Sequence, residues 1–265
     1  MYLITYVIAT HNEQNRILSL LESIPRTFYD FAIFHIQDCL STDHTLTIVE
    51  TFISYNPAIK IHVASQSDVG IYDAWNLAVA KCVTKWVSFL GADDIFIPNE
   101  FNLKALLLHE HSNYITFEGS FLGRPYGKPL PRKLQPISFI HGWSIQHQGS
   151  IYKLDLLRLH NFNTSFKICA DFEHMLRVRS KLVPRHINAR LYDIGPSGLS
   201  SSSYLIVAVE SAKAFLKVQD IGPLRFFYAA YIFAFILLYW IYRLILQLTR
   251  LRRPFRNQIT TNIII

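Results

Sequence analysis

The first hundred residues alternate short apolar runs with segments in which apolar residues recur every three or four positions. The short runs are rich in β-branched and aromatic residues, as buried strands are. They predict strands at Tyr2–Ala9, Phe31–Gln37, Ala58–Ala64 and Lys85–Leu90. The periodic segments predict helices at Glu13–Ile24, Asp43–Ser54, Ile71–Cys82 and Pro98–His111. This alternation predicts an α/β fold of Rossmann-like type, with a mostly parallel sheet flanked by helices.

The pattern changes after this alternating part. Glu118–Gln135 is rich in Gly, Pro and basic residues and has little periodicity, which predicts a long surface loop. Ile137–Ile194 mixes short strands with a helix over Asp171–Lys181, and a Gly/Ser turn then precedes a helix at Ser203–Val218. We therefore expect one α/β domain over residues 1–204, with halves 1–112 and 113–204, followed by C-terminal helices over 205–265.

The C-terminal part contains an apolar run, Phe226–Tyr242, with no charged residue. At 1.5 Å per residue the run reaches about 26 Å, which is marginal for a hydrocarbon layer of about 30 Å. Arg243 interrupts it, and Arg250, Arg252, Arg253 and Arg256 follow. We expect segment 226–246 to associate with a membrane as an in-plane or re-entrant helix. A single span and a hydrophobic dimer contact remain open alternatives, and the sequence leaves the oligomeric state undetermined.

The net charge of +7 is concentrated in this same part of the chain. Eight of the 26 basic residues but only one of the 19 acidic residues, Asp220, lie between Lys213 and Arg256, so the remainder is neutral. A basic segment beside an apolar run favours an anionic membrane surface over nucleic acid as the partner. The three cysteines form no metal or redox motif and fit a reducing compartment, and the N-terminal residues resemble a strand more than a signal peptide.

Polar motifs follow the predicted strands at the points where these strands end. They are ATHNE at residues 9–13, DCLSTDHT at 38–45, GIYDAWN at 70–76 after Asp68, and GADD at 91–94. Because ligands of an open parallel sheet bind outside the carboxyl ends of the strands, where the strand order reverses, we expect the four motifs to lie together. One such motif is weak evidence, whereas four in this order are specific.

Together these motifs resemble the family-2 glycosyltransferases of the GT-A fold, over roughly residues 4–200. The resemblance implies an enzyme that moves a sugar from a UDP- or GDP-linked donor to a hydroxyl of a glycan or lipid-linked acceptor. It further implies inversion by single displacement, in surface polysaccharide synthesis, with residues 1–112 binding the donor and 113–204 facing the acceptor. Cys39, Leu40 and His44 depart from the family pattern and leave the identity of the base open.

The resemblance also implies a role for individual donor-side residues. Residues expected to bind the nucleotide sugar are Thr10, His11 and Glu13 at the nucleoside, Asp38 at the base, Asp68 in the cleft, Asp73 and Asn76 at the ribose and sugar, and Asp93. Asp93 and Asp94 match the family's metal-binding motif, which implies Mn²⁺ or Mg²⁺ as cofactor. A hard divalent cation held by one or two carboxylates stabilises the charge that gathers on a diphosphate leaving group.

An inverting transfer also needs a base for the acceptor hydroxyl. The resemblance implies Asp171, in the segment CADFEH, as this catalytic base; a helix-capping role is the alternative for the same residue. Glu173 is a weaker candidate, and His147 and Gln148 resemble a segment that lines the acceptor side.

Two other classes of protein remain in consideration. A sugar-phosphate nucleotidyltransferase needs a glycine-rich phosphate loop after the first strand, and residues 9–16 contain no glycine. A non-catalytic membrane-associated binding protein would have the same C-terminal segment over 205–265 but would not need the candidate site carboxylates, all of which are present in this sequence. Because nucleotide sugars are cytosolic in bacteria, we expect the enzyme at the cytoplasmic face of the bacterial inner membrane, peripheral, re-entrant or single-span. The arginines that follow the apolar run favour the same side.

Overall fold

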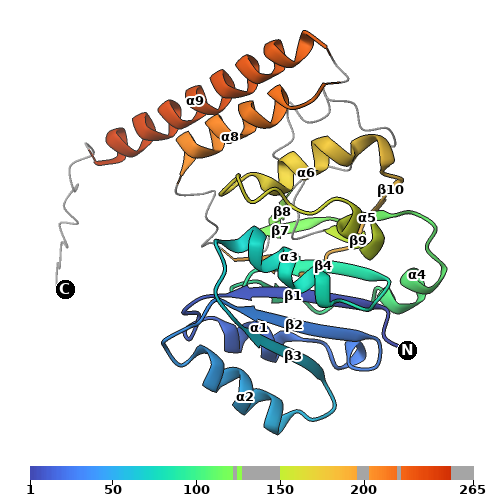
Figure 1. Ribbon diagram of the computed structural model, residues 1–265. Coiled ribbons are helices and arrows are strands. Elements are labelled where there is room, and N and C mark those ends of the chain that lie inside the picture. Colours follow the sequence, from blue (N-terminus) through green and yellow to red (C-terminus); the bar gives the residue numbers. More distant parts are fainter. Residues whose placement is uncertain (122–123, 127–149, 196–202, 220–221, 252–265) are drawn as a thin grey trace, which may run out of the picture.

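The computed structural model describes residues 1–121, 124–126, 150–195, 203–219 and 222–251 (Figure 1). Its main sheet has seven strands in the order β10-β6-β9-β4-β1-β2-β3. The strands are β1 (Ile4–Thr10), β2 (Ala32–Asp38), β3 (Lys60–Ser65), β4 (Trp86–Leu90), β6 (Tyr114–Phe117), β9 (Ser150–Lys153) and β10 (Pro184–Ile187). Only β9 runs antiparallel to its neighbours, β4 and β6. The predicted mostly parallel α/β fold is confirmed.

A second, four-stranded sheet has the order β5-β11-β7-β8. Its strands are β5 (Ile95–Phe96), β7 (Gly119–Phe121), β8 (Arg124–Tyr126) and β11 (Tyr192–Ile194). The prediction of a loop over Glu118–Gln135 is therefore wrong for β7 and β8, which pair antiparallel. Strands of three residues are too short to show an alternating pattern in the sequence. Residues 127–135 lie outside the described part of the chain.

Helices cover both faces of the main sheet. They are α1 (Ile17–Ser23), α2 (Thr45–Tyr55), α3 (Ile71–Lys81), α4 (Leu103–His109), α5 (Leu154–Leu159) and α6 (Ala170–Val178), with short 3-10 turns η1 (Arg26–Phe28) and η5 (Arg179–Lys181). Helix α2 begins after the cap residue His44, and the hydroxyl of the nearby Ser41 donates to Asp38. The first helix begins at Ile17 instead of Glu13, since Asn12 adopts a positive φ of 57° and residues 14–16 form a turn.

Strands β1, β4, β6 and β9 each supply side chains to two hydrophobic cores. On β1, Tyr6 and Ile8 pack in the core that also contains Leu21 of α1 and Val49 of α2. The intervening Val7 packs in the other core, which contains α3 and α6. This follows from the alternation of side chains along a strand, and it gives three layers with the sheet in the middle. The polar strand ends are thereby held at one edge of a rigid sheet.

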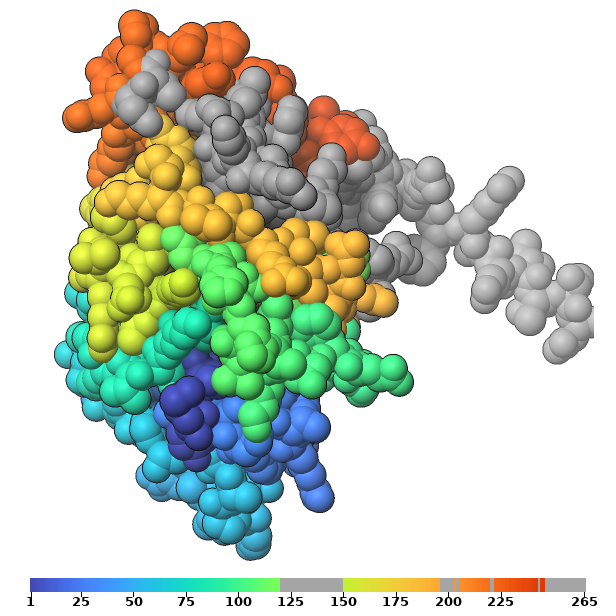
Figure 2. Space-filling model, turned by 90° about the vertical axis from the view of Figure 1, so that its right-hand side faces the viewer, coloured from blue at the N-terminus to red at the C-terminus, as the bar shows by residue number. Residues whose placement is uncertain are grey.

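The C-terminal hairpin consists of α8 (Tyr204–Leu216) and α9 (Leu224–Leu251), which pack against each other and lie at the end of the molecule remote from α2 (Figures 1 and 2). Helix α9 continues without a break through Arg243, the charged residue that follows the uncharged run of the sequence. Apolar residues on both sides sustain the helix, whose 28 residues span about 42 Å. Among the described residues one helical stretch, Leu224–Tyr242, is long and apolar enough to cross a membrane, and only 17% of it is buried.

Candidate active site

The strand order reverses at β1, which lies between β2 and β4. Strands β2 and β3 extend the sheet to one side, whereas β4 lies on the other. Thr10, the last residue of β1, is in register with Asp38, and Asp38 is in register with Ser65. The motifs that follow these strands therefore meet at one edge of the sheet, at the kind of position where α/β proteins bind ligands.

Asp38 is the centre of this edge. Its side chain is completely buried, and it accepts hydrogen bonds from Thr10 Oγ1 (3.0 Å), Ser41 Oγ (2.5 Å), Ser41 N (2.9 Å) and Ser65 Oγ (2.7 Å). Burial alone would raise the pKa of this carboxyl, but the hydrogen bonds outweigh burial and lower the pKa below its usual value. Asp38 thus ties together three strand ends, and its predicted contact with the nucleotide base stays a prediction.

The loops after β1 and β2 are joined by further hydrogen bonds. Asn12 donates from its main chain to Ser41 Oγ (2.8 Å) and accepts from Thr42 N at its side-chain oxygen (2.9 Å). His11 Nδ1 lies 2.8 Å from the carbonyl oxygen of Cys39, which can only accept. Nδ1 therefore carries the hydrogen, and Nε2 accepts from the Asn12 amide (3.2 Å). The exposed His11 ring is held in one orientation beside the predicted nucleoside pocket.

Leu40 shows how the loop accommodates its departure from the family pattern. Its φ of +48° lies in the left-handed region, and its side chain is 55% exposed. A non-glycine residue in this conformation costs about 1–2 kcal/mol. The hydrogen bonds of Asp38 on one side and Asn12 on the other hold the loop in shape despite that cost.

Two other predicted donor residues, Asp68 and Asp73, hold the start of α3. Asp68 Oδ1 accepts from Gly70 N (2.9 Å) and Asp73 Oδ2 accepts from Val69 N (3.1 Å), around a glycine with φ of +130°. Asn76 instead makes two hydrogen bonds with the main chain of Phe162, at 2.9 and 3.0 Å. Asn76 therefore fastens the segment before α6 to α3, while the sugar contacts predicted for Asp73 and Asn76 remain predictions.

The two adjacent acids after β4 differ in their surroundings. Asp94 is 1% exposed, and its two oxygens accept hydrogen bonds from Gly91 N (2.7 Å) and Gly195 N (3.0 Å). The half-buried Asp93 carboxylate lies between the same two glycines. A Cβ at Gly91 would come within 2.9 Å of Asp93 Oδ1, and a Cβ at Gly195 within 2.1 Å of Asp93 Cγ. Asp94 thus shapes the turn, and Asp93 is the better candidate for a metal ligand.

Asp93 lies in a negatively charged part of the site, near other carboxylates. Burial raises the pKa of the nearby Glu13 carboxyl, the negative charges of Asp93 and Asp43 raise it further, and the ion pair with Arg16 opposes both. Among the described residues, no three His, Cys, Asp or Glu side chains converge as a complete metal site. These residues fit a Mn²⁺ or Mg²⁺ ion that takes its remaining ligands from a diphosphate, because such ions are often bound by one or two carboxylates plus phosphate oxygens.

Asp171 is the second residue of α6, half-buried, and Cys169 occupies the cap position, so the alternative role as the cap residue does not apply. Oδ1 of Asp171 accepts from Phe172 N (2.8 Å) and lies 3.0 Å from the Tyr72 hydroxyl. The same hydroxyl lies 2.5 Å from the carbonyl oxygen of Ile168. Because Tyr72 belongs to α3, the helix that begins at the donor-side turn also contacts the predicted base.

Glu173, the second candidate base, lies on a different side of α6. It is 4% exposed and pairs with Arg177, with Oε1 3.0 Å from Nε and Oε2 3.1 Å from Nη2. A buried carboxylate committed to such an ion pair is poorly placed to take a proton from an acceptor. His147 and Gln148 lie outside the described residues.

Sequence reasoning missed three residues of the site: Tyr72, Gly195 and Glu210. Tyr72 is part of the GIYDAWN motif, but nothing in the motif shows that its hydroxyl reaches Asp171, 99 positions away. Gly195 begins the Gly/Ser turn of the sequence, and nothing in that turn shows that its main-chain N–H donates to Asp94. Glu210 of α8 accepts hydrogen bonds from the segment before Asp171, and an isolated acid on a mostly apolar helix gives no sequence signal of that contact.

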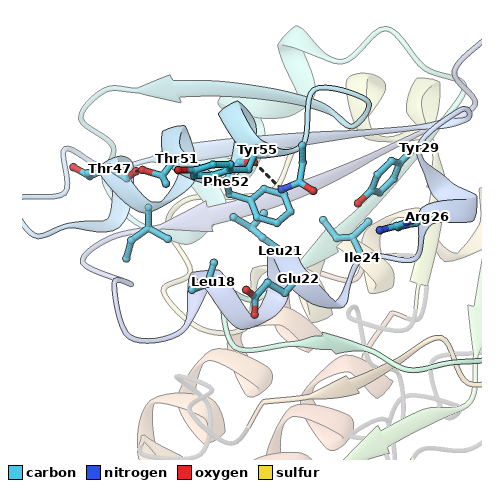
Figure 3. A pocket seen from close by; sticks show the side chains of 12 residues that line it. Leu18, Leu21, Glu22, Ile24, Arg26, Tyr29, Thr47, Thr51, Phe52 and Tyr55 are labelled. Carbon is cyan, nitrogen blue, oxygen red and sulfur yellow. Dashed lines mark hydrogen bonds between the residues drawn. The ribbon is translucent and has the colours of Figure 1, made fainter.

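A pocket of about 530 Å³ lies elsewhere, between α1 and α2 (Figure 3). Its floor includes Leu21, Ile24 and Phe52, and Arg26 and Tyr29 lie at one end. None of the predicted site residues lines it. We place the active site at the carboxyl edge of the sheet, because the converging carboxylates and perturbed pKa values occur there.

The fold and the carboxylates at its switch point define a GT-A-type, nucleotide-binding α/β domain. The family model for glycosyl transferase family 2 matches residues 5–170. The chain therefore belongs to this family and is a glycosyltransferase that uses a nucleotide-sugar donor.

Several known proteins are similar to this chain. The PGL/p-HBAD biosynthesis glycosyltransferases of Mycobacterium bovis and Mycobacterium tuberculosis are 27% identical over 187 residues, which cover 69% of this chain and 72% of theirs. Staphylococcus aureus TarS 1–349 in complex with UDP-GlcNAc superposes with a TM-score of 0.62 at 20% identity, covering 89% of this chain and 71% of that one.

A mannosyltransferase from Pyrobaculum calidifontis, PcManGT, solved in complex with GDP-Man and Mn²⁺, has a TM-score of 0.63 at 16% identity, covering 87% of this chain and 69% of that one. The chain spans 66% of another TarS 1–349 structure and 40% of a longer TarS chain. At these identities the structural similarity demonstrates the fold alone.

Proposed function

We propose that this enzyme transfers a sugar from a UDP- or GDP-linked donor to a hydroxyl of a glycan or lipid-linked acceptor, in the synthesis of a bacterial surface polysaccharide. The observation that carries the proposal is the Tyr72 hydroxyl, which lies 3.0 Å from Asp171 and projects from the helix that starts at the donor-side turn. This contact supports a single site that combines the donor-side carboxylates with the candidate base. Complexes of TarS with UDP-GlcNAc and of PcManGT with GDP-Man support this donor class.

In this mechanism Asp171 accepts the proton of the attacking hydroxyl as the acceptor oxygen bonds to the anomeric carbon. The bond to the diphosphate breaks on the opposite face, so the anomeric configuration inverts. Asp93, beside Glu13, would hold a Mn²⁺ or Mg²⁺ ion, which when bound offsets the charge of the leaving diphosphate. Asp94 keeps the turn in shape through its two amide hydrogen bonds, and the Tyr72 hydroxyl orients the base.

The test begins with thermal-shift measurements on the full chain. Ligands that bind only the folded state raise the melting temperature. UDP-glucose, UDP-N-acetylglucosamine and GDP-mannose are compared with and without Mn²⁺ or Mg²⁺, and the best donor is then incubated with a bacterial membrane-lipid extract. We expect a metal-dependent shift and a labelled lipid product of inverted anomeric configuration, read by NMR. Retained configuration would contradict the mechanism, and no shift with any UDP- or GDP-sugar would contradict the donor class.

We further propose that the C-terminal hairpin lies in the plane of the cytoplasmic leaflet. On α9, Ala229, Ile232 and Ile236 are buried, and α9 packs closely along α8, which keeps α9 against the domain. The remaining sides of the hairpin expose Leu205, Ile206, Val209, Leu216, Leu224, Phe226, Phe227, Tyr231, Phe235, Leu238, Trp240, Ile241, Tyr242, Leu244 and Ile245. A helix that is apolar all round requires an apolar medium, and the basic residues of this region suit anionic headgroups at about 1 kcal/mol each.

This placement is tested with a single cysteine inserted after Thr260, in a Cys39→Ser background because Cys39 is the least buried of the three native cysteines. In intact cells we expect protection from an impermeant thiol reagent, together with recovery of the protein in the membrane fraction. Labelling from outside would establish a single span and reject the in-plane arrangement.

A further inference from the structure

The segment Lys167–Cys169, which leads directly into the helix of Asp171, is held from two sides. From α3, the Tyr72 hydroxyl contacts the carbonyl oxygen of Ile168. From α8, the Glu210 carboxylate accepts three main-chain hydrogen bonds: Lys167 N to Oε1 at 2.7 Å, and Ile168 N and Cys169 N to Oε2, each at 2.9 Å. Glu210 is 8% exposed, so these bonds are shielded from water.

Side-chain contacts reinforce the connection between α8 and α6. Cys169 Sγ lies 3.8 Å from the carbonyl oxygen of Val207 and 3.7 Å from Ser211 Oγ. Phe172, the residue after the predicted base, packs edge-on against Phe215 of α8, with ring centroids 5.7 Å apart. Phe215 in turn contacts Tyr228 of α9 at 5.7 Å. A continuous series of contacts therefore runs from the base to the apolar hairpin.

We propose that Glu210 is a positioning residue: through the main chain of Lys167–Cys169 it holds Asp171 in place, and it thereby makes the C-terminal hairpin part of the catalytic machinery. The inference rests on the proposed role of Asp171 as the base. The match to the family model ends at residue 170, so α8 and Glu210 lie beyond the part of the chain that the family model describes.

The chemistry of the contact requires a carboxylate. Three N–H groups converge on two oxygens, and both oxygens must accept. Glutamine has nearly the same shape but only one accepting oxygen, and its NH₂ group would face at least one N–H donor. Glu210→Gln therefore loosens the segment without opening a cavity. A displacement of about 1 Å at a catalytic group costs roughly 10²-fold in rate.

The test uses full-length Glu210→Gln in phosphatidylethanolamine/phosphatidylglycerol vesicles, with Glu50→Gln on the exposed face of α2 as the matched control. Hydrogen exchange, read by mass spectrometry, should become at least about tenfold faster in peptides covering residues 163–175. Peptides from β1 to β4 should exchange as in the wild type, and Glu50→Gln should leave both regions unchanged. Unchanged exchange at 163–175 overturns the proposal, whatever the substrate.

A double-mutant cycle with Asp171→Asn separates positioning from general destabilisation. Glu210→Gln alone should lower kcat by about 10- to 100-fold with the donor dissociation constant within about twofold of wild type. In the Asp171→Asn background the same substitution should cost almost nothing, because its effect passes through Asp171. An equal loss in both backgrounds overturns the positioning role. Full turnover in the Asp171→Asn single variant would instead reject Asp171 as the base. Failure of the positioning role of Glu210 and failure of the proposed base are therefore distinguishable.

Discussion

The donor side and the base side of this active site are held together in different ways. On the donor side, Asp38 bonds to Thr10, Ser41 and Ser65, which all follow or end neighbouring strands of one sheet. On the base side, Asp171 depends on contacts from two separate helices. The Tyr72 hydroxyl of α3 contacts Asp171, which lies 99 positions later in the chain. Glu210 of α8 accepts hydrogen bonds from Lys167–Cys169, which precede it by 41 to 43 positions.

This difference has a physical origin. Strand ends in a parallel sheet are placed by main-chain register, so short motifs after them assemble wherever the sheet forms. The base segment has no strand to place it, and its geometry follows from how α3, α6 and α8 pack. The donor side should therefore tolerate changes in the hairpin, whereas the base side should not.

The largest expected effect is at the base itself. Asp171→Asn should lower kcat by roughly 10²–10⁴-fold, the usual contribution of a general base, while the donor dissociation constant stays within about twofold. The matched control is Asp155→Asn, because Asp155 is likewise the second residue of its helix, α5, but is exposed. Steady-state turnover and donor binding are measured for both variants. Near-normal turnover in Asp171→Asn would remove the base from this side of the site.

The next effect concerns the apolar face of the hairpin. Phe227 and Leu238 are 62% and 65% exposed on α9, and burying such side chains contributes about 1.5–3 kcal/mol each. Replacing both by Ser should weaken binding to phosphatidylglycerol-containing vesicles by about 10²-fold or more in a sedimentation assay. Leu159→Ser on α5, at a residue that is 77% exposed, should leave binding unchanged. Equal vesicle binding by all three proteins would reject the membrane-facing assignment.

Substitutions of the adjacent acids Asp93 and Asp94 should have different effects, because we expect Asp93 to bind the metal and Asp94 to stabilise the turn. Asp93→Asn should weaken metal-dependent nucleoside diphosphate binding by about tenfold or more in calorimetry with little change in melting temperature. Asp94→Asn should instead lower the free energy of unfolding by about 1–3 kcal/mol, because one of two buried amide donors loses its acceptor. A chelator should abolish the difference in nucleotide binding between wild type and Asp93→Asn. Affinity unaffected by the chelator would contradict a metal role for Asp93.

The smallest effect is a dependence of stability on pH that originates in the base side. His174 of α6 is fully buried against Phe162 and Tyr152, and burial, together with the positive charge of Arg177, lowers its pKa to about 3. As the pH falls below about 6.5, His174 takes up a proton in the unfolded chain but stays neutral in the folded one. This residue therefore makes the free energy of unfolding fall by up to about 1.4 kcal/mol per pH unit from pH 6.5 toward pH 3.

Urea unfolding between pH 7 and pH 5 measures this effect. His174→Phe should reduce the fall relative to wild type, whereas His109→Gln, at an exposed residue of α4, should follow the wild-type curve. Parallel curves for wild type and His174→Phe would show that His174 is not buried in its neutral form.

The sequence predicted the donor side well, because main-chain register in the sheet places the residues on this side. The same register makes the donor side tolerant of changes elsewhere in the chain. The first four strands start and end within two residues of their predicted bounds, and the motifs after β1, β2 and β4 meet as expected. Hydrophobic periodicity reports directly on elements of this length, whereas it could not show the three-residue strands β7 and β8.

By itself, the sequence determined the α/β architecture, the meeting of the polar motifs at one sheet edge, and the concentration of basic and apolar residues in the tail. Local patterns encode these features, since each depends on residues close together in the chain or on main-chain register. Tertiary structure alone decided which of two adjacent acids is buried, that Asn76 binds a main-chain segment, and that Tyr72 and Glu210 hold the base. These contacts join residues 41 to 101 positions apart, and only the packing of helices on the sheet brings such residues within hydrogen-bonding distance.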